Sequence, residues 1–177
     1  VELAGTRSAH RRDAVAEIGA GQRPRAHEVV GPLADVIRAH DLPVDLLDRM
    51  IAARRWDIGK DPFDDLPALI AHLDATGAGL MWLTARALGA TDRIEPDVRR
   101  IGLAGAIANW LMAVPRLEGR GRYPLPDGRP AAVADLAAQG LDLLRLAAPA
   151  QCGPAKPALR AAWRAGGRAE DGAAWGW

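Results

Sequence analysis

The chain has few of the residues that build disulfides, zinc sites and β-sheets. It contains one Cys, one Tyr and one Phe among its 177 residues, so an internal disulfide is excluded. It has no Cys cluster and no pair of His residues at helical spacing, which removes the usual ligands of zinc. β-branched residues are few, whereas Ala and Leu dominate the apolar set. This balance favours helices over sheets and predicts an all-α protein.

Net charge and long apolar runs are also lacking. The net charge of +1 provides no strong electrostatic attraction to nucleic acid or to an anionic membrane. The longest apolar run, roughly residues 101–114, is too short to span a bilayer and predicts a buried helix rather than a transmembrane segment. The first residues have no apolar core of the signal-peptide type. We therefore expect a cytoplasmic protein, with attachment to the membrane periphery left open.

Apolar residues recur at helical spacing along most of the chain, which predicts a single-domain helical bundle. The expected helices cover residues 8–18, 27–40, 43–56, 66–88, 97–114, 131–147 and 158–165. Asp41 and Asp65 are expected to cap the third and fourth helices, and Pro115 to end the fifth.

The bundle is expected to occupy residues 1–150. Residues 151–177 are expected to form a short helix and a loose tail, in which Trp175 and Trp177 could dock on a partner.

Gly77 and Gly79 lie inside the segment 66–88. Each costs about 1 kcal/mol relative to Ala at an exposed helix position. The sequence therefore predicts an offsetting feature, which is either close approach of another helix or a kink that faces a cavity.

The most informative segment runs from Asn109 to Pro126, NWLMAVPRLEGRGRYPLP. Asn109 lies in an apolar run, and a buried amide needs hydrogen-bond partners, so we expect it to bond to a neighbouring helix. Arg116, Arg120 and Arg122 surround two Gly residues, a combination that can bind phosphate. The interpretation as a solvated loop with ordinary surface charge is favoured.

This segment resembles a motif of squalene and phytoene synthases, A-Q-x-x-N-x-x-R-D-x-x-E-D-x-x-x-G-R-x-Y-x-P. Aligned without a gap, Asn109, Gly121, Arg122 and Pro126 match, and Tyr123 lies one place before the Tyr. Other motif positions differ: Ala106, Met112, Ala113, Arg116 and Leu117 replace Gln, Arg, Asp, Glu and Asp, and Pro124 takes the position of the Tyr.

The resemblance extends over residues 11–147 and implies a shortened isoprenoid-synthase-like fold. Active members hold magnesium between two Asp-rich helices. Ala113 and Leu117 cannot bind a metal, and the first Asp-rich helix is expected to be missing. The segment 111–126 resembles most the degenerate branch that includes the mitochondrial assembly factor for respiratory complex I.

The resemblance to that branch implies a non-catalytic assembly factor or accessory subunit of a membrane-bound respiratory or photosynthetic complex, without a metal and with a protein partner. The candidate residues of a vestigial or ligand-binding site are Asn109, Arg120, Arg122, Tyr123 and Gly77.

Two alternatives remain open. A working prenyl-diphosphate transferase would need magnesium held by Asp57, Asp61, Asp64 or Asp65, although a helix cap and loop is the favoured interpretation of Asp61–Asp65. A metal-free binder would hold an isoprenoid or lipid in the old cavity.

Overall fold

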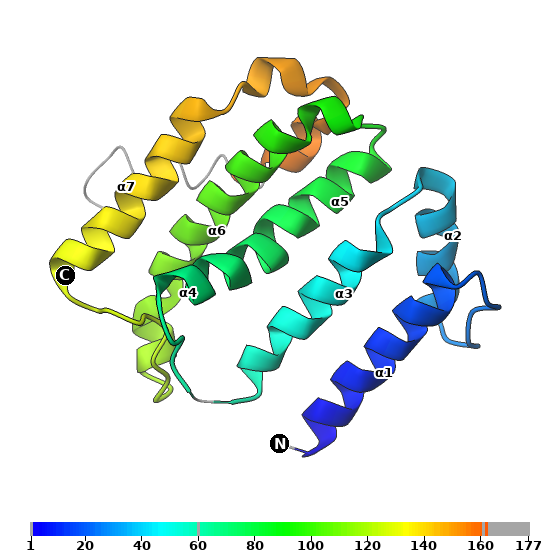
Figure 1. The fold of residues 1–177 in the computed structure, drawn as a ribbon, viewed down its shortest axis with the longest axis horizontal. Helices are drawn as coiled ribbons and strands as arrows, with labels where there is room; N and C mark the ends of the chain where they lie inside the picture. Colours follow the sequence, from blue (N-terminus) through cyan, green and yellow to red (C-terminus); the bar gives the residue numbers. More distant parts are fainter. Residues whose placement is uncertain (1, 60, 161, 163–177) are drawn as a thin grey trace.

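The computed structural model describes residues 2–59, 61–160 and 162, and these residues form helices without any strand (Figure 1). The α-helices are α1 (Glu2–Gly19), α2 (Val30–His40), α3 (Val44–Ala53), α4 (Leu66–Leu73), α5 (Gly79–Ala87), α6 (Glu95–Glu118) and α7 (Pro130–Leu146). Short elements join them: η1 (Arg54–Asp57), η2 (Asp74–Ala78), η3 (Asp92–Ile94) and η4 (Pro149–Ala155). The predicted all-α class is confirmed.

The bundle buries two hydrophobic clusters. The first core joins α1, α2, α3 and α5 to the start of α6 and to the segment after α7; its largest side chain is Trp82, which is 2% exposed. The second core lies between α4, the second half of α6 and α7, around Leu69, Ile107, Leu111 and Leu136. Figure 1 shows α6 between α5 and α7, so α6 contributes to both cores.

The predicted helix over 66–88 is confirmed as one continuous helical stretch made of α4, η2 and α5. Asp65 caps it as predicted, because its Oδ1 accepts a hydrogen bond from the Ala68 N–H at 2.7 Å. The stretch Leu66–Ala87 is long and apolar enough to cross a membrane by length and composition alone. Like α6, this stretch contributes to both cores of the bundle, as buried Leu69 and Trp82 illustrate.

The middle of this stretch, η2, is a π turn that packs very closely on α6. A Cβ added to Gly77 would lie 2.4 Å from the Cβ of Ala106, and one added to Gly102 would lie 2.8 Å from the Cα of Ala78. Only residues without a larger side chain permit this separation of the two helices. Close helix approach is therefore the feature that offsets the helical cost of Gly77.

Several predicted helix boundaries are wrong. The first helix begins at Glu2 and not at residue 8, and the second begins at Val30 and not at residue 27. Pro115 does not end α6, which continues to Glu118. Burial of Leu111 and Val114, each 1% exposed, holds this turn against the core and outweighs the hydrogen bond that Pro cannot donate. Asp41 does not cap α3, because it ends α2 in the left-handed conformation with φ of 47°, and the residue before α3 is Pro43.

Part of the C-terminal segment packs against the bundle. Cys152, Ala155 and Ala162 are buried in the first core, and a Cβ added to Gly105 would lie 2.9 Å from the Cβ of Ala162. Residues 156–160 are helical, so the short helix begins slightly earlier than expected. Trp175 and Trp177 lie outside the described residues, and the boundary at residue 150 stays a prediction.

Candidate functional site

The degenerate motif lies on the second half of α6 and on the loop that follows it. Asn109 is exposed, which makes the prediction of a buried, hydrogen-bonded amide wrong. The reason is helical geometry: Asn109 lies two residues from Ile107 and from Leu111, about 200° around the helix from each of these buried side chains. The apolar run therefore extends around α6 farther than the buried face does.

The two positions that carry Asp in the motif hold Ala113 and Leu117, both partly buried. Neither side chain offers an oxygen to a metal. In the described part of the chain, no three His, Cys, Asp or Glu residues lie close enough together to hold a metal ion. Magnesium needs several oxygen ligands, usually including one or two carboxylates, so the residues at this place do not fit the ion that the motif implies.

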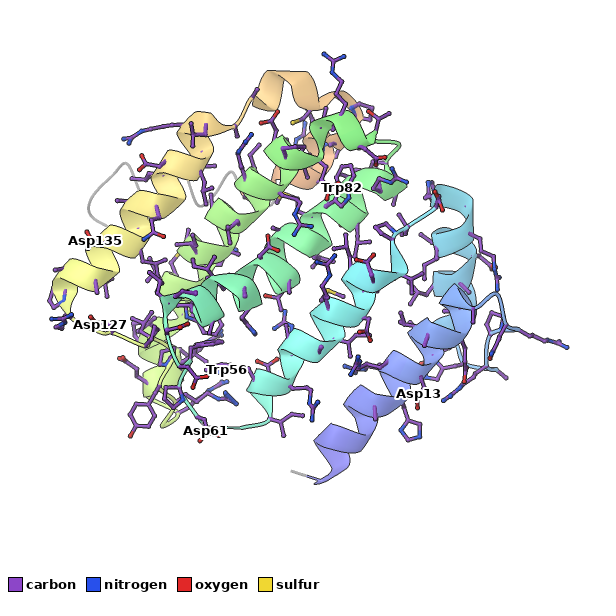
Figure 2. All side chains as sticks on the ribbon, viewed as in Figure 1. Asp13, Trp56, Asp61, Trp82, Asp127 and Asp135 are labelled. Carbon is purple, nitrogen blue, oxygen red and sulfur yellow. The ribbon has the colours of Figure 1, made fainter. Side chains whose placement is uncertain are left out.

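Four rings gather beside this part of α6: Trp56, Phe63, His72 and Trp110, which we call the ring cluster. Trp56 and Phe63 are stacked, with ring centroids 4.9 Å apart and an angle of 6° between their planes. Trp110 meets Trp56 edge to face at 5.2 Å and His72 at 5.4 Å. Such pairs add roughly 0.5–1.5 kcal/mol each beyond the burial of their area. The side chains come from η1, the loop before α4, α4 itself and α6, so the ring cluster joins four segments. Figure 2 labels Trp56, the member on η1.

Arg122 closes one side of the ring cluster. Its guanidinium carbon lies 4.5 Å from the centroid of the Trp56 ring, a cation–π arrangement. It also donates hydrogen bonds to the backbone carbonyls of Trp56, at 3.2 Å, and of Asp57. These contacts tie the loop after α6 to η1, and they occupy donors of Arg122 that a phosphate group would otherwise use.

The same loop has a second attachment. The indole N–H of Trp110 donates to the carbonyl of Pro124 at 3.0 Å, and Pro124 is almost fully buried. By contrast, the indole nitrogen of Trp56 is buried without a hydrogen-bond partner, alone among the side chains that the structure describes. An unsatisfied buried donor costs about 1–3 kcal/mol, so the packing around Trp56 must offset that cost.

His72 is 6% exposed and packs inside the ring cluster. Burial lowers the pKa of its imidazole; Arg54 acts in the same direction, while the Asp57 carboxylate and a hydrogen bond to Ala53 oppose the change. The neutral form is thus favoured near pH 7. His72 is therefore an ordinary packed histidine of the ring cluster.

Arg120 and Tyr123 are exposed on the loop that follows α6, and among the described residues neither side chain makes a ring contact or a hydrogen bond with the ring cluster. Arg120 is exposed and makes no ion pair within the described residues, and Tyr123 is 67% exposed. Gly77 lies at the contact between η2 and α6, beside Ala106. Of the five residues predicted for a vestigial site, the structure therefore brings Arg122 alone to the ring cluster, and their roles in ligand binding stay predictions.

The four aspartates weighed as metal ligands do not gather into a site. All four are exposed; Asp65 serves as the α4 cap, Asp57 lies 3.5 Å from Arg54, and Asp61 lies in the loop between η1 and α4 (Figure 2). Residues 61–63 are not helical, so the spacing of four residues does not place Asp61 and Asp65 on one helix face. The cap-and-loop interpretation of this segment fits the structure.

Sequence reasoning did not find the ring cluster. Phe63 lies among aspartates in KDPFDDL, and Trp110 lies within an apolar run, so no local pattern distinguishes either residue. The signal was available in the scarcity of aromatic residues, since the cluster takes the single Phe and two of the six Trp. Their meeting depends on the fold, because they lie on segments far apart along the chain.

The fold and the motif together define the class of protein. An all-α bundle with a degenerate prenyl-diphosphate synthase motif on α6 is an isoprenoid-synthase-like helical protein. The family is shown by sequence: residues 2–177 match the squalene/phytoene synthase family, and the chain belongs to it.

A solved structure supports the fold. The chain is similar to the crystal structure of squalene synthase HpnC from Alicyclobacillus acidocaldarius, with a TM-score of 0.62 and 17% identity over 86% of this chain and 68% of that one. At this identity the likeness concerns the fold alone. No curated protein matches the chain.

Proposed function

We propose that this protein is a non-catalytic member of the squalene/phytoene synthase family that acts as an assembly factor or accessory subunit of a membrane-bound respiratory or photosynthetic complex. The observation that carries the proposal is the pair Ala113 and Leu117 at the two Asp positions of the motif, with no substitute cluster of metal ligands in the part of the chain that the structure describes.

The surroundings of these two positions support the loss of catalysis. Chemistry on a prenyl diphosphate needs magnesium to neutralise the leaving diphosphate. Within the motif segment, Trp110 instead packs in the ring cluster, and Arg122 is engaged with Trp56 and with two backbone carbonyls. The protein partner and the cytoplasmic site of action, at the membrane periphery, are parts of the same proposal and follow from the resemblance to the degenerate branch.

The first test is binding and turnover of prenyl diphosphates. Farnesyl diphosphate and geranylgeranyl diphosphate are titrated by calorimetry with and without magnesium, and release of diphosphate is followed. We expect no turnover and no magnesium-dependent binding. Turnover that requires magnesium would overturn the proposal and establish the alternative, a prenyl-diphosphate transferase.

The second test addresses the partner. The tagged full chain is used to capture proteins from detergent-solubilised membranes, and the captured proteins are identified by mass spectrometry. Enrichment of several subunits or assembly intermediates of one respiratory or photosynthetic complex is expected. Their absence, with an unrelated helical protein of the same size as control, would argue against the assembly role.

A metal-free binder of an isoprenoid or lipid is the second candidate. It is favoured by one observation: Arg116 and Arg120 are exposed near the end of α6 and have no ion-pair partner within the described residues. Binding of farnesyl diphosphate without magnesium, lost in the double variant Arg116→Ala/Arg120→Ala, would support it. The variant Arg145→Ala is the control, since Arg145 is an exposed arginine on α7.

A further inference from the structure

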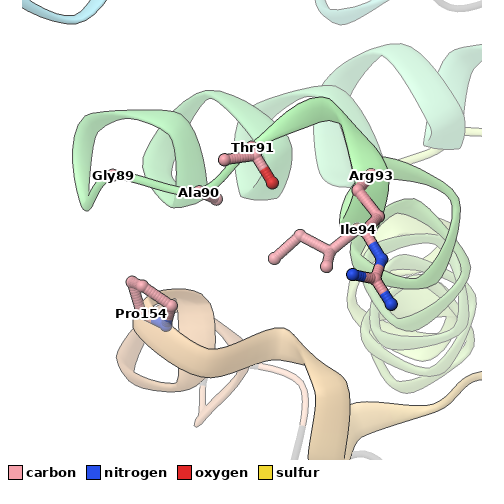
Figure 3. A pocket seen from close by; sticks show the side chains of 6 residues that line it. All are labelled: Gly89, Ala90, Thr91, Arg93, Ile94 and Pro154. Atoms are coloured by element: carbon pink, nitrogen blue, oxygen red, sulfur yellow. The ribbon is translucent and has the colours of Figure 1, made fainter.

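A pocket of about 490 Å³ lies at the other end of α6, far from the degenerate motif. It is bounded by the turn between α5 and α6 and by the segment after α7, and its lining residues are Gly89, Ala90, Thr91, Arg93, Ile94 and Pro154 (Figure 3). Its volume falls within the range of about 300–1,000 Å³ that is usual for small-molecule sites. A helix rises about 1.5 Å per residue, so roughly 30 Å separate the pocket from Leu117.

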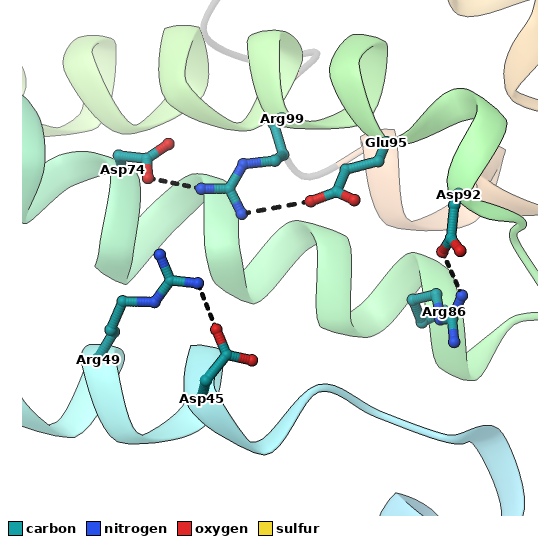
Figure 4. Close-up of polar contacts among 7 residues, drawn as sticks. All are labelled: Asp45, Arg49, Asp74, Arg86, Asp92, Glu95 and Arg99. Carbon is teal, nitrogen blue, oxygen red and sulfur yellow. Dashed lines mark hydrogen bonds and ion pairs between the residues drawn. The ribbon is translucent and has the colours of Figure 1, made fainter.

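The charged residues of the turn from 92 to 97, which lines this pocket, are paired with one exception within the described residues. Asp92 pairs with Arg86, Glu95 lies 3.7 Å from Arg99, and Asp97 accepts a hydrogen bond from Arg100 at 3.0 Å. Figure 4 shows the first two of these pairs, and Arg99 also reaches Asp74 at 2.6 Å. Each acidic residue from 92 to 97 is thus neutralised by an arginine.

Arg93 is the exception. Within the described residues its guanidinium has no ion pair, although it lines the pocket. The hydroxyl of Thr91 likewise has no hydrogen-bond partner in the described part of the chain. Lys156, two residues beyond Pro154, is exposed and also has no ion pair with another described residue. The pocket therefore combines a free guanidinium and a free hydroxyl with the apolar surfaces of Ile94 and Pro154 (Figure 3).

We propose that this pocket binds a phosphate monoester, with the phosphate held by Arg93 and Thr91 and the carbon part of the ester against Ile94 and Pro154. A guanidinium presents paired N–H donors that match phosphate oxygens, and a hydroxyl can donate a further bond. The apolar surfaces favour an ester over bare inorganic phosphate, because they have nothing to bind in the free ion. The site is independent of the proposed assembly role and of the degenerate motif.

The phosphate could belong to a soluble ester or to a lipid headgroup, and one experiment separates them. The full chain, labelled with ¹⁵N, is titrated with inorganic phosphate, with glycerol 3-phosphate and with short-chain phosphatidic acid below its micelle concentration. We expect saturable shifts of the amide signals of Thr91, Arg93 and Ile94 with both esters. Phosphatidic acid binding at least tenfold tighter than glycerol 3-phosphate indicates a lipid headgroup, and equal affinities indicate a soluble ester.

Variants tie the signal to the pocket. Arg93→Ala should weaken binding at least tenfold, Thr91→Val less, and Arg93→Lys should keep part of it because the charge remains without the fork. Arg145→Ala, an equal loss of charge on α7, should change nothing. Absence of saturable shifts at these amides, inorganic phosphate binding as tightly as the esters, or equal weakening by Arg145→Ala would each overturn the proposal. Arg93 and Thr91 are exposed, so the variants at these two positions should fold.

Discussion

The two cores of the bundle are built differently. Among the described residues, the buried members of the first core are aliphatic side chains and Cys152 around one large indole, that of Trp82, and none of them carries a charge. The partly buried guanidinium of Arg86 lies 5.8 Å from the centroid of the Trp82 ring. The second core adjoins the ring cluster, which brings a buried imidazole, an unpaired indole N–H and the guanidinium of Arg122 into contact with it. Hydrocarbon packing should therefore dominate the stability of the first core, whereas directional contacts contribute in the second.

The largest expected effect breaks the first core. Trp82→Ala removes a side chain that is 2% exposed, and we expect a loss of about 3–5 kcal/mol in the free energy of unfolding, measured with urea. Leu80→Ala, two residues away on the same helix but 47% exposed, should cost less than about 1 kcal/mol. Similar losses in the two variants would show that the first core is not packed as described.

The next effect concerns the contact between the cores. Gly77→Ala places a Cβ 2.4 Å from the Cβ of Ala106, so α6 and η2 must separate. Overpacking of this kind costs roughly 1–3 kcal/mol. Gly79→Ala in α5 is the matched control, because its φ of −60° is helical and its added Cβ would meet only the Asp74 carbonyl oxygen, at an ordinary contact distance of 3.5 Å. This change should stabilise the protein by about 0.4–1 kcal/mol. Thermal unfolding of both variants gives the comparison, and a stabilised Gly77→Ala would rule out the close contact.

A smaller effect sharpens the description of the second core. Arg122→Met keeps a long apolar side chain but removes the cation–π contact and two hydrogen bonds to carbonyls. Because Arg122 is partly exposed, we expect a loss of about 1–2 kcal/mol, less than the full value of such bonds in a dry site.

The control for this change is Arg120→Met, which removes an exposed arginine from the same loop and should be neutral within about 0.5 kcal/mol. The fluorescence of the Trp residues should change in Arg122→Met and not in Arg120→Met. Equal effects would mean that Arg122 does not hold the loop on the ring cluster.

The smallest effect is a pH dependence that belongs to the second core. Burial lowers the pKa of His72 in the folded protein, so the unfolded chain binds more protons as the pH falls below the usual histidine pKa of about 6.5. Stability should therefore be complete above that pH and decrease down to the folded pKa, by at most about 1.4 kcal/mol per pH unit.

Urea unfolding between pH 8 and pH 5 measures this dependence. His72→Phe should remove it while leaving the ring in place, and His40→Gln, a change at an exposed histidine, should leave it intact. A slope that survives in His72→Phe would assign the effect to another group.

The sequence predicted well whatever depends on local pattern. Apolar periodicity placed the helices, and Asp65 was identified as a cap because the capping residue and the helix it serves are neighbours. Pro115 shows the limit of such rules, since a local preference against helix lost to the burial of Leu111 and Val114 on the same turn. Local propensity is a weak guide where tertiary packing is strong.

The site was less accessible to prediction for the same reason. Asn109 was expected to be buried because its neighbours are apolar, yet the direction of its side chain depends on which face of α6 meets α4 and α7. The engagement of Arg122 with Trp56 joins residues far apart in the chain. No spacing rule connects such residues, and contacts of this kind follow only from the packed structure.

The π turn at η2 also determines the direction in which the side chains of α5 point relative to those of α4, within the continuous helical stretch Leu66–Ala87. The buried residues of α4, such as Leu69, serve the second core, and those of α5, such as Trp82, serve the first. Each residue advances an α-helix by about 100°, so the extra residue of a π turn rotates everything after it by that amount. Deleting one residue between 74 and 78 would therefore direct Trp82 away from the first core, although every apolar side chain of α4 and α5 would still be present.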